Sequence, residues 1–310
     1  MIICCGEALI DMLPRVTADG EQAFAPYAGG AVFNTAIALG RLGISTGFFT
    51  GLSTDLFGDI LRQTLDSSGV DHSLCARSDR PTTLAFVKLT DGHASYAFFD
   101  ENTAGRMIEV TDLPTLGDDV EALHFGAISL ISEPCASTYE KLMRREASRR
   151  VVSLDPNIRP SFIKDHDGHR ARMKRMIAMS DIVKLSDEDL AWFGYQGGAE
   201  EAARDWLADG VSIVIVTRGA NGAEAYCSQG KVDVPGLKVT VADTVGAGDT
   251  VNAGVLASLY SKSILTKEAL AVISTEDLTD AVSLGMKAAA VTVSRPGANP
   301  PHAHEIGFQV

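Results

Sequence analysis

Short apolar runs alternate with amphipathic stretches along the chain, and this alternation constrains the fold more than any other feature. Apolar runs of this kind are typical of strands buried on both faces, as in a parallel sheet covered by helices. Helical segments between such strands return the chain to the start of the next strand. The sequence therefore predicts an α/β fold with a doubly wound, mainly parallel sheet flanked by helices.

The expected elements follow from this pattern. The predicted strands are residues 1–6, 45–51, 120–125, 151–155, 181–185, 212–217 and 223–227. The predicted helices are residues 31–43, 56–69, 135–149, 168–179, 199–209, 248–260 and 276–290. Gly43 stands where a helix-terminating glycine is expected.

Two intervals break the alternation. Residues 10–28 look extended, and the runs 83–89 and 94–100 are joined by Asp91-Gly92, a dipeptide typical of hairpin turns. These segments form either a small β lid over the strand ends or an antiparallel extension of the main sheet. The simplest division is one domain over residues 1–310, with lid segments at about 11–30 and 81–105.

Composition excludes several classes of function. The net charge of −13 argues against binding to nucleic acid or to an anionic membrane surface. The five cysteines are odd in number and lack C-x-x-C spacing, which argues against a disulfide framework and a zinc site. No run approaches the roughly 18–20 apolar residues of a membrane span, and the first residues lack the basic region of a secretory signal. We expect a cytoplasmic protein.

The string DTVGAGDT at residues 243–250 is the most informative segment. Gly246 and Gly248 allow a tight turn, and the helix that follows adds free N–H groups and the positive end of its dipole. This arrangement suits a phosphoryl group. Asp249 beside it could take a proton from an attacking hydroxyl, although the short G-A-G-D turn alone equally fits an aspartate that caps the helix.

This string, followed by VNAGVLASLY, resembles the C-terminal signature of the ribokinase (PfkB-type) carbohydrate kinases. The segment GGAVFNTAIALGRLG at residues 29–43 resembles their N-terminal signature, so the resemblance covers the whole chain. It implies that Gly246, Ala247 and Gly248 form the anion hole and that Asp249 is the catalytic base. A P-loop motif is missing, and so is the G-x-G-x-x-G of dinucleotide enzymes.

The resemblance also implies an ATP site. It places Thr217, Arg218, Gly219 and Gly222 around the phosphates, Lys184 facing them, and Lys287 with its alanines on the adenine side. From the residues alone, a plain turn at 217–222 and close helix packing at the alanines remain alternatives. Asp189 would contact magnesium through water, although Ser186 and Asp189 replace the family's N-x-x-E residues and also fit a helix cap. The resemblance also implies a site for a monovalent cation, such as potassium, near Asp243.

On the sugar side the resemblance implies Asp11, Gly29, Gly30, Asn34, Tyr96, Phe98, Arg159 and Asp249. Asn34 could instead lie on a helix surface, and Arg159 could form a surface ion pair. The segment DPNIR at residues 155–159 resembles one found in fructokinases and 2-keto-3-deoxygluconate kinases, and the hairpin sequence resembles that of fructokinases. The chain is thus expected to transfer the γ-phosphoryl group of Mg-ATP to a hexose, fructose first, as a homodimer.

Three alternatives stay open at this stage. The acceptor could be 2-keto-3-deoxygluconate, or it could be ribose or a nucleoside. The chain could also be a catalytically silent sugar-binding regulator on the same fold, because fold does not fix function.

Overall fold

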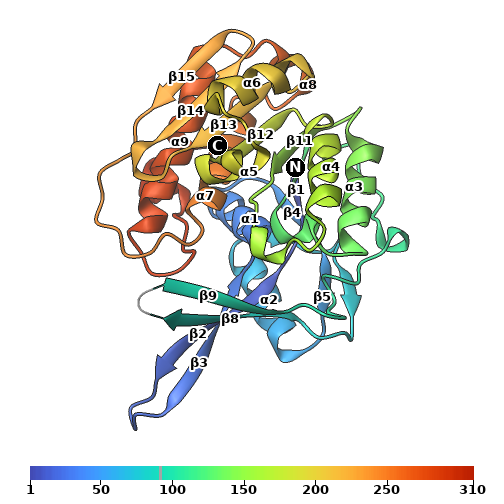
Figure 1. Ribbon diagram of the computed structural model, residues 1–310, viewed down its shortest axis with the longest axis vertical. Helices are drawn as coiled ribbons and strands as arrows, with labels where there is room; N and C mark the ends of the chain where they lie inside the picture. Colours follow the sequence, from blue (N-terminus) through green and yellow to red (C-terminus); the bar gives the residue numbers. More distant parts are fainter. Residues whose placement is uncertain (91–92) are drawn as a thin grey trace.

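A sheet of nine strands forms the centre of the molecule (Figure 1). In the computed structural model, residues 1–90 and 93–310 are described, with the backbone only for 87–90 and 93–96. From edge to edge the strands are β15 (Gly230–Val234), β14 (Ala223–Cys227), β13 (Ile213–Thr217), β12 (Ile182–Ser186), β11 (Val151–Asp155), β10 (Ala122–Gly126), β1 (Ile2–Cys5), β4 (Thr46–Phe49) and β6 (Val70–Asp71). Neighbours from β13 to β6 pair in parallel, whereas β13, β14 and β15 pair antiparallel. The predicted mainly parallel sheet is confirmed.

Helices cover both faces of this sheet, which explains the continuous apolar runs of its strands. Along β1, Ile2 and Cys4 pack into the core of one face, and Ile3 and Cys5 into the core of the other. The first face carries α1 (Ala31–Arg41), α2 (Leu56–Ser67), α7 (Ala247–Ser261), α8 (Lys267–Ala271) and α9 (Thr275–Val293). The second carries α3 (Cys135–Glu146), α4 (His166–Ile177), α5 (Asp187–Phe193) and α6 (Gly198–Ala208). None of the described helices combines the length and apolar character needed to cross a membrane.

A separate sheet of four strands lies beside this body, at the bottom of Figure 1. Its order is β3 (Gln22–Gly29), β2 (Leu9–Val16), β8 (Thr83–Thr90) and β9 (His93–Phe99). The extended segments are therefore not an extension of the main sheet, and that alternative is wrong. The predicted Asp91-Gly92 turn lies outside the described residues.

The remaining differences concern short elements. The predicted strand 45–51 is divided between β4 and β5 (Gly51–Ser53), and β5 pairs with β7 (Ala76–Ser78) in a third sheet. The sequence reading did not predict α5, α8, β6, β7 or β15 as elements. All of these are short, so they contain too little periodic pattern to be recognised.

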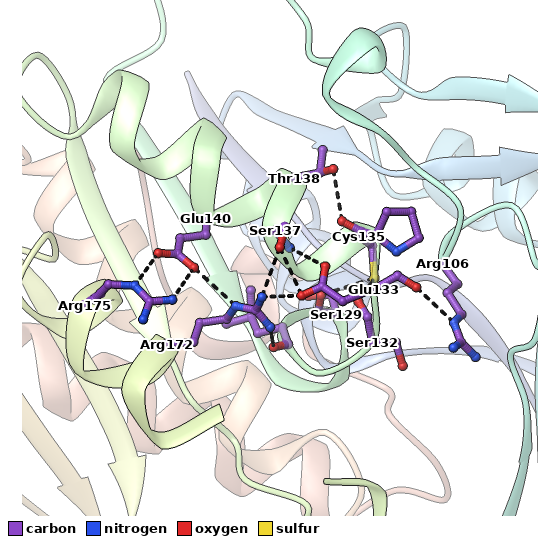
Figure 2. A network of polar contacts seen from close by, with 12 residues as sticks. Arg106, Ser129, Ser132, Glu133, Cys135, Ser137, Thr138, Glu140, Arg172 and Arg175 are labelled. Carbon is purple, nitrogen blue, oxygen red and sulfur yellow. Dashed lines mark hydrogen bonds and ion pairs between the residues drawn. The ribbon is translucent and has the colours of Figure 1, made fainter. Parts of the chain in front are cut away.

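Charged contacts hold α3 against α4 on the second face (Figure 2). Arg175 binds Glu140 with two N–H groups, at 2.7 Å to Oε1 and 2.9 Å to Oε2. Arg172 reaches Glu140 and Glu133 with its guanidinium and donates to the carbonyl oxygen of Leu130. This network fixes the turn at 127–130, part of which borders the cavity described next.

Candidate active site

A cavity of about 880 Å³ opens at the carboxyl ends of the parallel strands. Its walls come from the nine-stranded sheet, from the four-stranded sheet (hereafter the second sheet), and from the first turns of α1, α5 and α7. Ligands bind at this edge in doubly wound folds, because the loops that follow the strands converge there. The geometry of the cavity therefore decides which predicted site residues can act together.

The first turn of α7 forms one end of the cavity. Gly246 occupies the cap position with φ 77°, which a glycine adopts without strain, and a Cβ there would lie 2.7 Å from Cβ of Ala298. A Cβ on Gly248 would lie 2.8 Å from Nζ of Lys184. The first N–H groups of a helix have no intrahelical acceptor, so this turn can bind an anion.

Asp249 is buried at the third position of α7. It does not cap the helix, because Gly246 holds that position and no side chain caps it. Asn34 of α1 donates a hydrogen bond of 2.9 Å from Nδ2 to Oδ2 of Asp249, and Thr35 donates to its backbone oxygen. Asn34 and Asp249, which lie 215 positions apart in the chain and were both predicted for the sugar side, are therefore in direct contact in the structure.

The environment of Asp249 makes its carboxylate a stronger base. Burial raises its pKa to about 7, and repulsion from Asp155 acts in the same direction. The hydrogen bond from Asn34 and the charges of Lys184 and Arg159 oppose this shift. A carboxylate with a pKa near neutrality can accept a proton from a hydroxyl and release it later.

Several of the predicted sugar residues lie on the four-stranded sheet. Asp11 of β2 and Phe98 of β9 line the cavity, and burial raises the pKa of Asp11 to about 6. Arg159, which follows β11, also lines it. The side chain of Tyr96 lies outside the described residues.

Gly29 and Gly30 lie where neighbouring protein atoms leave no room for a side chain. A Cβ on Gly29 would lie 2.3 Å from Oδ2 of Asp11. Gly30 has φ 110°, and a Cβ there would lie 2.9 Å from the backbone oxygen of Glu7. Both positions therefore exclude a side chain, and Gly30 itself lines the cavity.

The predicted nucleotide residues divide into two groups. Thr217, Gly219 and Lys184 line the cavity. Gly222 does not: it has φ 94°, and a Cβ there would lie 2.0 Å from the oxygen of Val234, so it allows close packing on β15.

Two predicted cations lie away from the cavity lining. Arg218 pairs with Glu224 at 2.6 Å and Asp233 at 3.1 Å, so its guanidinium faces the β14–β15 hairpin. Lys287 is exposed on α9, whose cavity face is formed by Met286, Ala289, Ala290 and Val293. These four follow the spacing i, i+3, i+4, i+7 of one helix face, and Lys287 lies off it.

The predicted metal residues already have protein partners. Asp189 accepts hydrogen bonds from the N–H groups of Ile158 and Ser186 and from the Ser186 hydroxyl, and it forms a capping box with Ser186. Asp243 accepts from the N–H groups of Val245 and Gly297. Among the described residues, no three acidic, cysteine or histidine side chains gather as a metal site. Asp189 therefore fits contact with an ion through water better than direct coordination.

The sequence reading missed Glu7, a buried carboxylate at the end of β1. Oε1 accepts from the N–H groups of Ala31 and Val32, and Oε2 from that of Ser129. It thereby joins β1 to the start of α1 and to the turn after β10. Its place directly after the first strand was the only signal in the sequence.

The loop before α7 was missed as well. Leu237, Val239 and Val241 border the cavity although each is more than 40% exposed. Exposed apolar side chains around a cavity are suited to covering a flat, apolar ligand surface. An apolar loop without periodicity gives no signal of this kind in the sequence.

Comparison with known proteins agrees with this geometry. The model of the pfkB family carbohydrate kinases matches residues 1–305. The chain belongs to this family of carbohydrate kinases, and the fold recognised above is the ribokinase-like fold.

Several individual relatives are fructokinases. A fructokinase of Rhizobium leguminosarum bv. trifolii is 63% identical over 278 residues, which cover 90% of this chain and 85% of that protein. The structure of a fructokinase with bound ATP from Xylella fastidiosa has a TM-score of 0.89 and 29% identity, covering 98% and 97% of the two chains. A Vibrio cholerae O395 fructokinase in its fructose, ADP and calcium ion bound form has a TM-score of 0.84 and 28% identity, covering 99% and 98%.

Proposed function

We propose that this protein is a fructokinase, which transfers the γ-phosphoryl group of ATP to a hydroxyl of fructose. The 63% identity to a bacterial fructokinase over 90% of the chain carries this assignment. The cavity supports it, because a buried carboxylate and a helix N-terminus lie together in its lining. In-line phosphoryl transfer needs a group that orients the hydroxyl and donors that stabilise the transferred charge.

In the proposed reaction, Asp249 takes the proton from the attacking hydroxyl while Asn34 holds its carboxylate in place. The N–H groups of the Gly246–Gly248 turn and the ammonium of Lys184 stabilise the negative charge on the phosphoryl oxygens. These groups are fixed before the substrates bind, so little reorganisation accompanies the reaction. Arg159, at the same end of the cavity, adds a cation toward the transferred group.

The sugar would bind between the second sheet and the first turn of α1. Asp11 would accept hydrogen bonds from sugar hydroxyls, and Gly29 and Gly30 would let the backbone approach. Phe98 packs edge-on against Phe162, with ring centroids 4.5 Å apart, and would cover the sugar. We propose that residues 11–30 and 81–105 act as a lid that excludes water when both substrates are bound.

ATP would lie along the Thr217–Gly219 turn, with its base against the alanines of α9 and the apolar loop. Magnesium would enter with the nucleotide and neutralise phosphate charge, held by phosphate oxygens and water because Mg²⁺ keeps several waters. Asp189 would touch it only through water. A potassium ion near Asp243 remains a prediction, and activity with and without K⁺ tests it.

We also propose a cytoplasmic homodimer. All five cysteines are free and buried, which suits a reducing compartment. The second sheet exposes Phe24 and Phe99 at 48% and 59%, large aromatic side chains that a second copy could cover. Light scattering after gel filtration measures the mass in solution, and a monomer at micromolar concentration would overturn the dimer.

A sugar panel in an assay of ADP release tests the function. We expect the highest kcat/KM for fructose, with ribose, nucleosides and 2-keto-3-deoxygluconate well below it. A sugar acid is disfavoured because the carboxylate of Asp11 would repel its charge on the proposed sugar side. A higher kcat/KM for another acceptor would replace fructose, and sugar binding without ADP release would favour the silent regulator.

A further inference from the structure

Asp155, the last residue of β11, lies under the anion-binding turn and is 3% exposed. Its Oδ2 accepts two hydrogen bonds: 2.9 Å from Nζ of Lys184 and 2.7 Å from Nδ2 of Asn252. Lys184 belongs to β12 and Asn252 to α7. One carboxylate oxygen therefore joins two neighbouring strands to the helix that carries Asp249.

The contact fixes the ammonium of Lys184 at a particular place. A Cβ on Gly248 would lie 2.8 Å from Nζ, so the ammonium lies directly against the first turn of α7. Lysine has a flexible four-carbon stem, and its ammonium needs a partner to hold one position. Asp155 supplies that partner from below the turn, and Lys184 still lines the cavity.

Asn252 links the same carboxylate to the base. It follows Asp249 by three residues on α7, so both side chains lie on neighbouring positions of one helix face. Movement of α7 relative to β12 would have to break the bond from Asn252 or that from Lys184. The spacing between the ammonium of Lys184 and the carboxylate of Asp249 is held in this way.

Stability alone is a weak reason for this arrangement. A buried ion pair is often no better for stability than apolar residues of similar volume. The other oxygen, Oδ1 of Asp155, is buried and has no hydrogen-bond partner among the described residues, which adds a further cost. A site that keeps a buried ion pair with one unsatisfied oxygen close to the base indicates a role in the reaction.

We propose that Asp155 is a positioning residue for phosphoryl transfer, which holds the ammonium of Lys184 beside Gly248 and, through Asn252, at a fixed distance from Asp249. This rests on the proposed function. Asp155 itself touches neither substrate in this scheme, and its effect is exerted through Lys184.

The charge of Asp155 also keeps Lys184 protonated. Burial alone would lower the pKa of Lys184, but attraction to Asp155 and the more distant Asp249 and Asp189 raises it above its ordinary value. His124 of β10 also interacts with Lys184, and burial lowers the pKa of His124 to about 3, so its ring is neutral. Without the charge of Asp155, Lys184 would lose its proton at lower pH.

The test replaces Asp155 by asparagine, which keeps the shape and removes the charge. We expect Asp155→Asn to lower kcat at least ~10-fold with KM for fructose within ~2-fold, because the lost positioning acts on the transferred charge. The alkaline limb of the kcat profile should move to lower pH. A purely structural role would lower the melting temperature and leave that limb in place.

Asp181→Asn is the matched control. Asp181 is also buried and pairs with a lysine, Lys267, at 2.7 Å, but just before β12 begins, at the opposite edge of the sheet. We expect this variant to lose stability and keep the kcat of the unmodified protein. Equal losses of kcat in Asp155→Asn and Asp181→Asn would overturn the proposal.

A double-mutant cycle with Lys184→Gln completes the test. If Asp155 acts through Lys184, adding Asp155→Asn to Lys184→Gln should change kcat by less than ~2-fold. Full additivity of the two substitutions, or an unchanged kcat in Asp155→Asn, would refute the proposal.

Asn252→Ala serves as a second variant if Asp155→Asn does not fold. It keeps both charges and should still lower kcat at least ~3-fold, and an unchanged kcat in this variant would also refute the proposal. If another sugar is the acceptor, kcat in the double-mutant cycle is measured with that sugar. If the protein turns over no ATP with any sugar, the proposed function is refuted instead.

Discussion

Removing the hydrogen bond between Asn34 and Asp249 should shift the pH dependence of the enzyme. Asn34 is the donor that stabilises the charged form of Asp249, at 2.9 Å. A hydrogen bond to a charged group contributes about 1.5–3 kcal/mol, and one pKa unit corresponds to about 1.4 kcal/mol. Asn34→Leu should therefore raise the pKa of Asp249 from about 7 by at least about one unit.

The consequence is a change in the acid limb of the pH profile of kcat/KM, which reports the pKa values of groups in the free enzyme. A base with a pKa of about 7 is half ionised at pH 7. A shift of about one unit leaves about a tenth of the molecules ionised, so kcat/KM at pH 7 should fall about fivefold from this cause alone. At pH 9 this loss should disappear, and any remaining loss measures weaker sugar binding.

Thr35→Val is the control, because Thr35 contacts the backbone oxygen of Asp249 and not its carboxylate. The assay follows ADP release from pH 5.5 to 9 at subsaturating fructose. Titration of ATP itself is the same for all three proteins, so differences between them belong to the protein. If the acid limbs of the kcat/KM profiles of Asn34→Leu and Thr35→Val coincide, the hydrogen bond from Asn34 does not lower the pKa of Asp249, and the prediction is refuted.

Three further outcomes are expected. Gly248→Ala should lower kcat at least ~10-fold because its Cβ would displace the ammonium of Lys184, whereas the melting temperature should hardly change since a flexible side chain can move. Glu7→Leu leaves three N–H groups without an acceptor and should lower the free energy of unfolding by about 3 kcal/mol in urea titrations. The hydrogen bond from Arg175 lowers the pKa of Glu140 to about 2, so its ionic contribution to stability is complete above pH 4.5 and lost as the pH falls toward 2. Glu140→Gln should lower the free energy of unfolding by about 1 kcal/mol at pH 7 after solvent screening. At pH 3, the melting temperatures of the variant and the unmodified protein should differ less.

The sequence predicted the long elements of the fold well because their pattern is local. The run IVIVT of β13 is buried on both faces of the sheet. The apolar spacing of α9 is that of one helix face against the core, whereas α1 is a mostly apolar helix buried along residues 32–39. Whether residues 10–28 and 83–100 joined the main sheet could not be predicted, because strand partners are chosen by long-range contacts that a local pattern does not contain.

The same distinction applies to the site. Asp249 and Asn34 lie in the first turns of helices at the ligand-binding edge, so their positions could be predicted from where these helices begin. Asp11 was predicted to follow the first strand, and it lies inside β2. Arg218 follows a strand at that edge too, yet its guanidinium turns to carboxylates of the β14–β15 hairpin, and β15 was not predicted.

Glu7 and Asp155 show the opposite case. Their roles depend on contacts with residues 24 to 122 positions away for Glu7 and 29 to 97 positions away for Asp155. Only the folded structure brings these partners together. The DPNIR segment begins with Asp155, but the sequence does not show which residues its carboxylate contacts; the hydrogen bonds of the folded structure do.

Replacing Asp249 by asparagine is the direct test of whether this residue is the base that accepts the proton of the sugar hydroxyl. The change removes the charge and keeps the shape, so Asn34 and the helix N-terminus stay in place. The measurement is kcat for ADP release at saturating fructose and ATP, together with the Kd of fructose by calorimetry. We expect kcat to fall about 10²–10⁴-fold, the usual contribution of general base catalysis, with the Kd of fructose within about threefold. A kcat within about tenfold of the unmodified protein would contradict the claim.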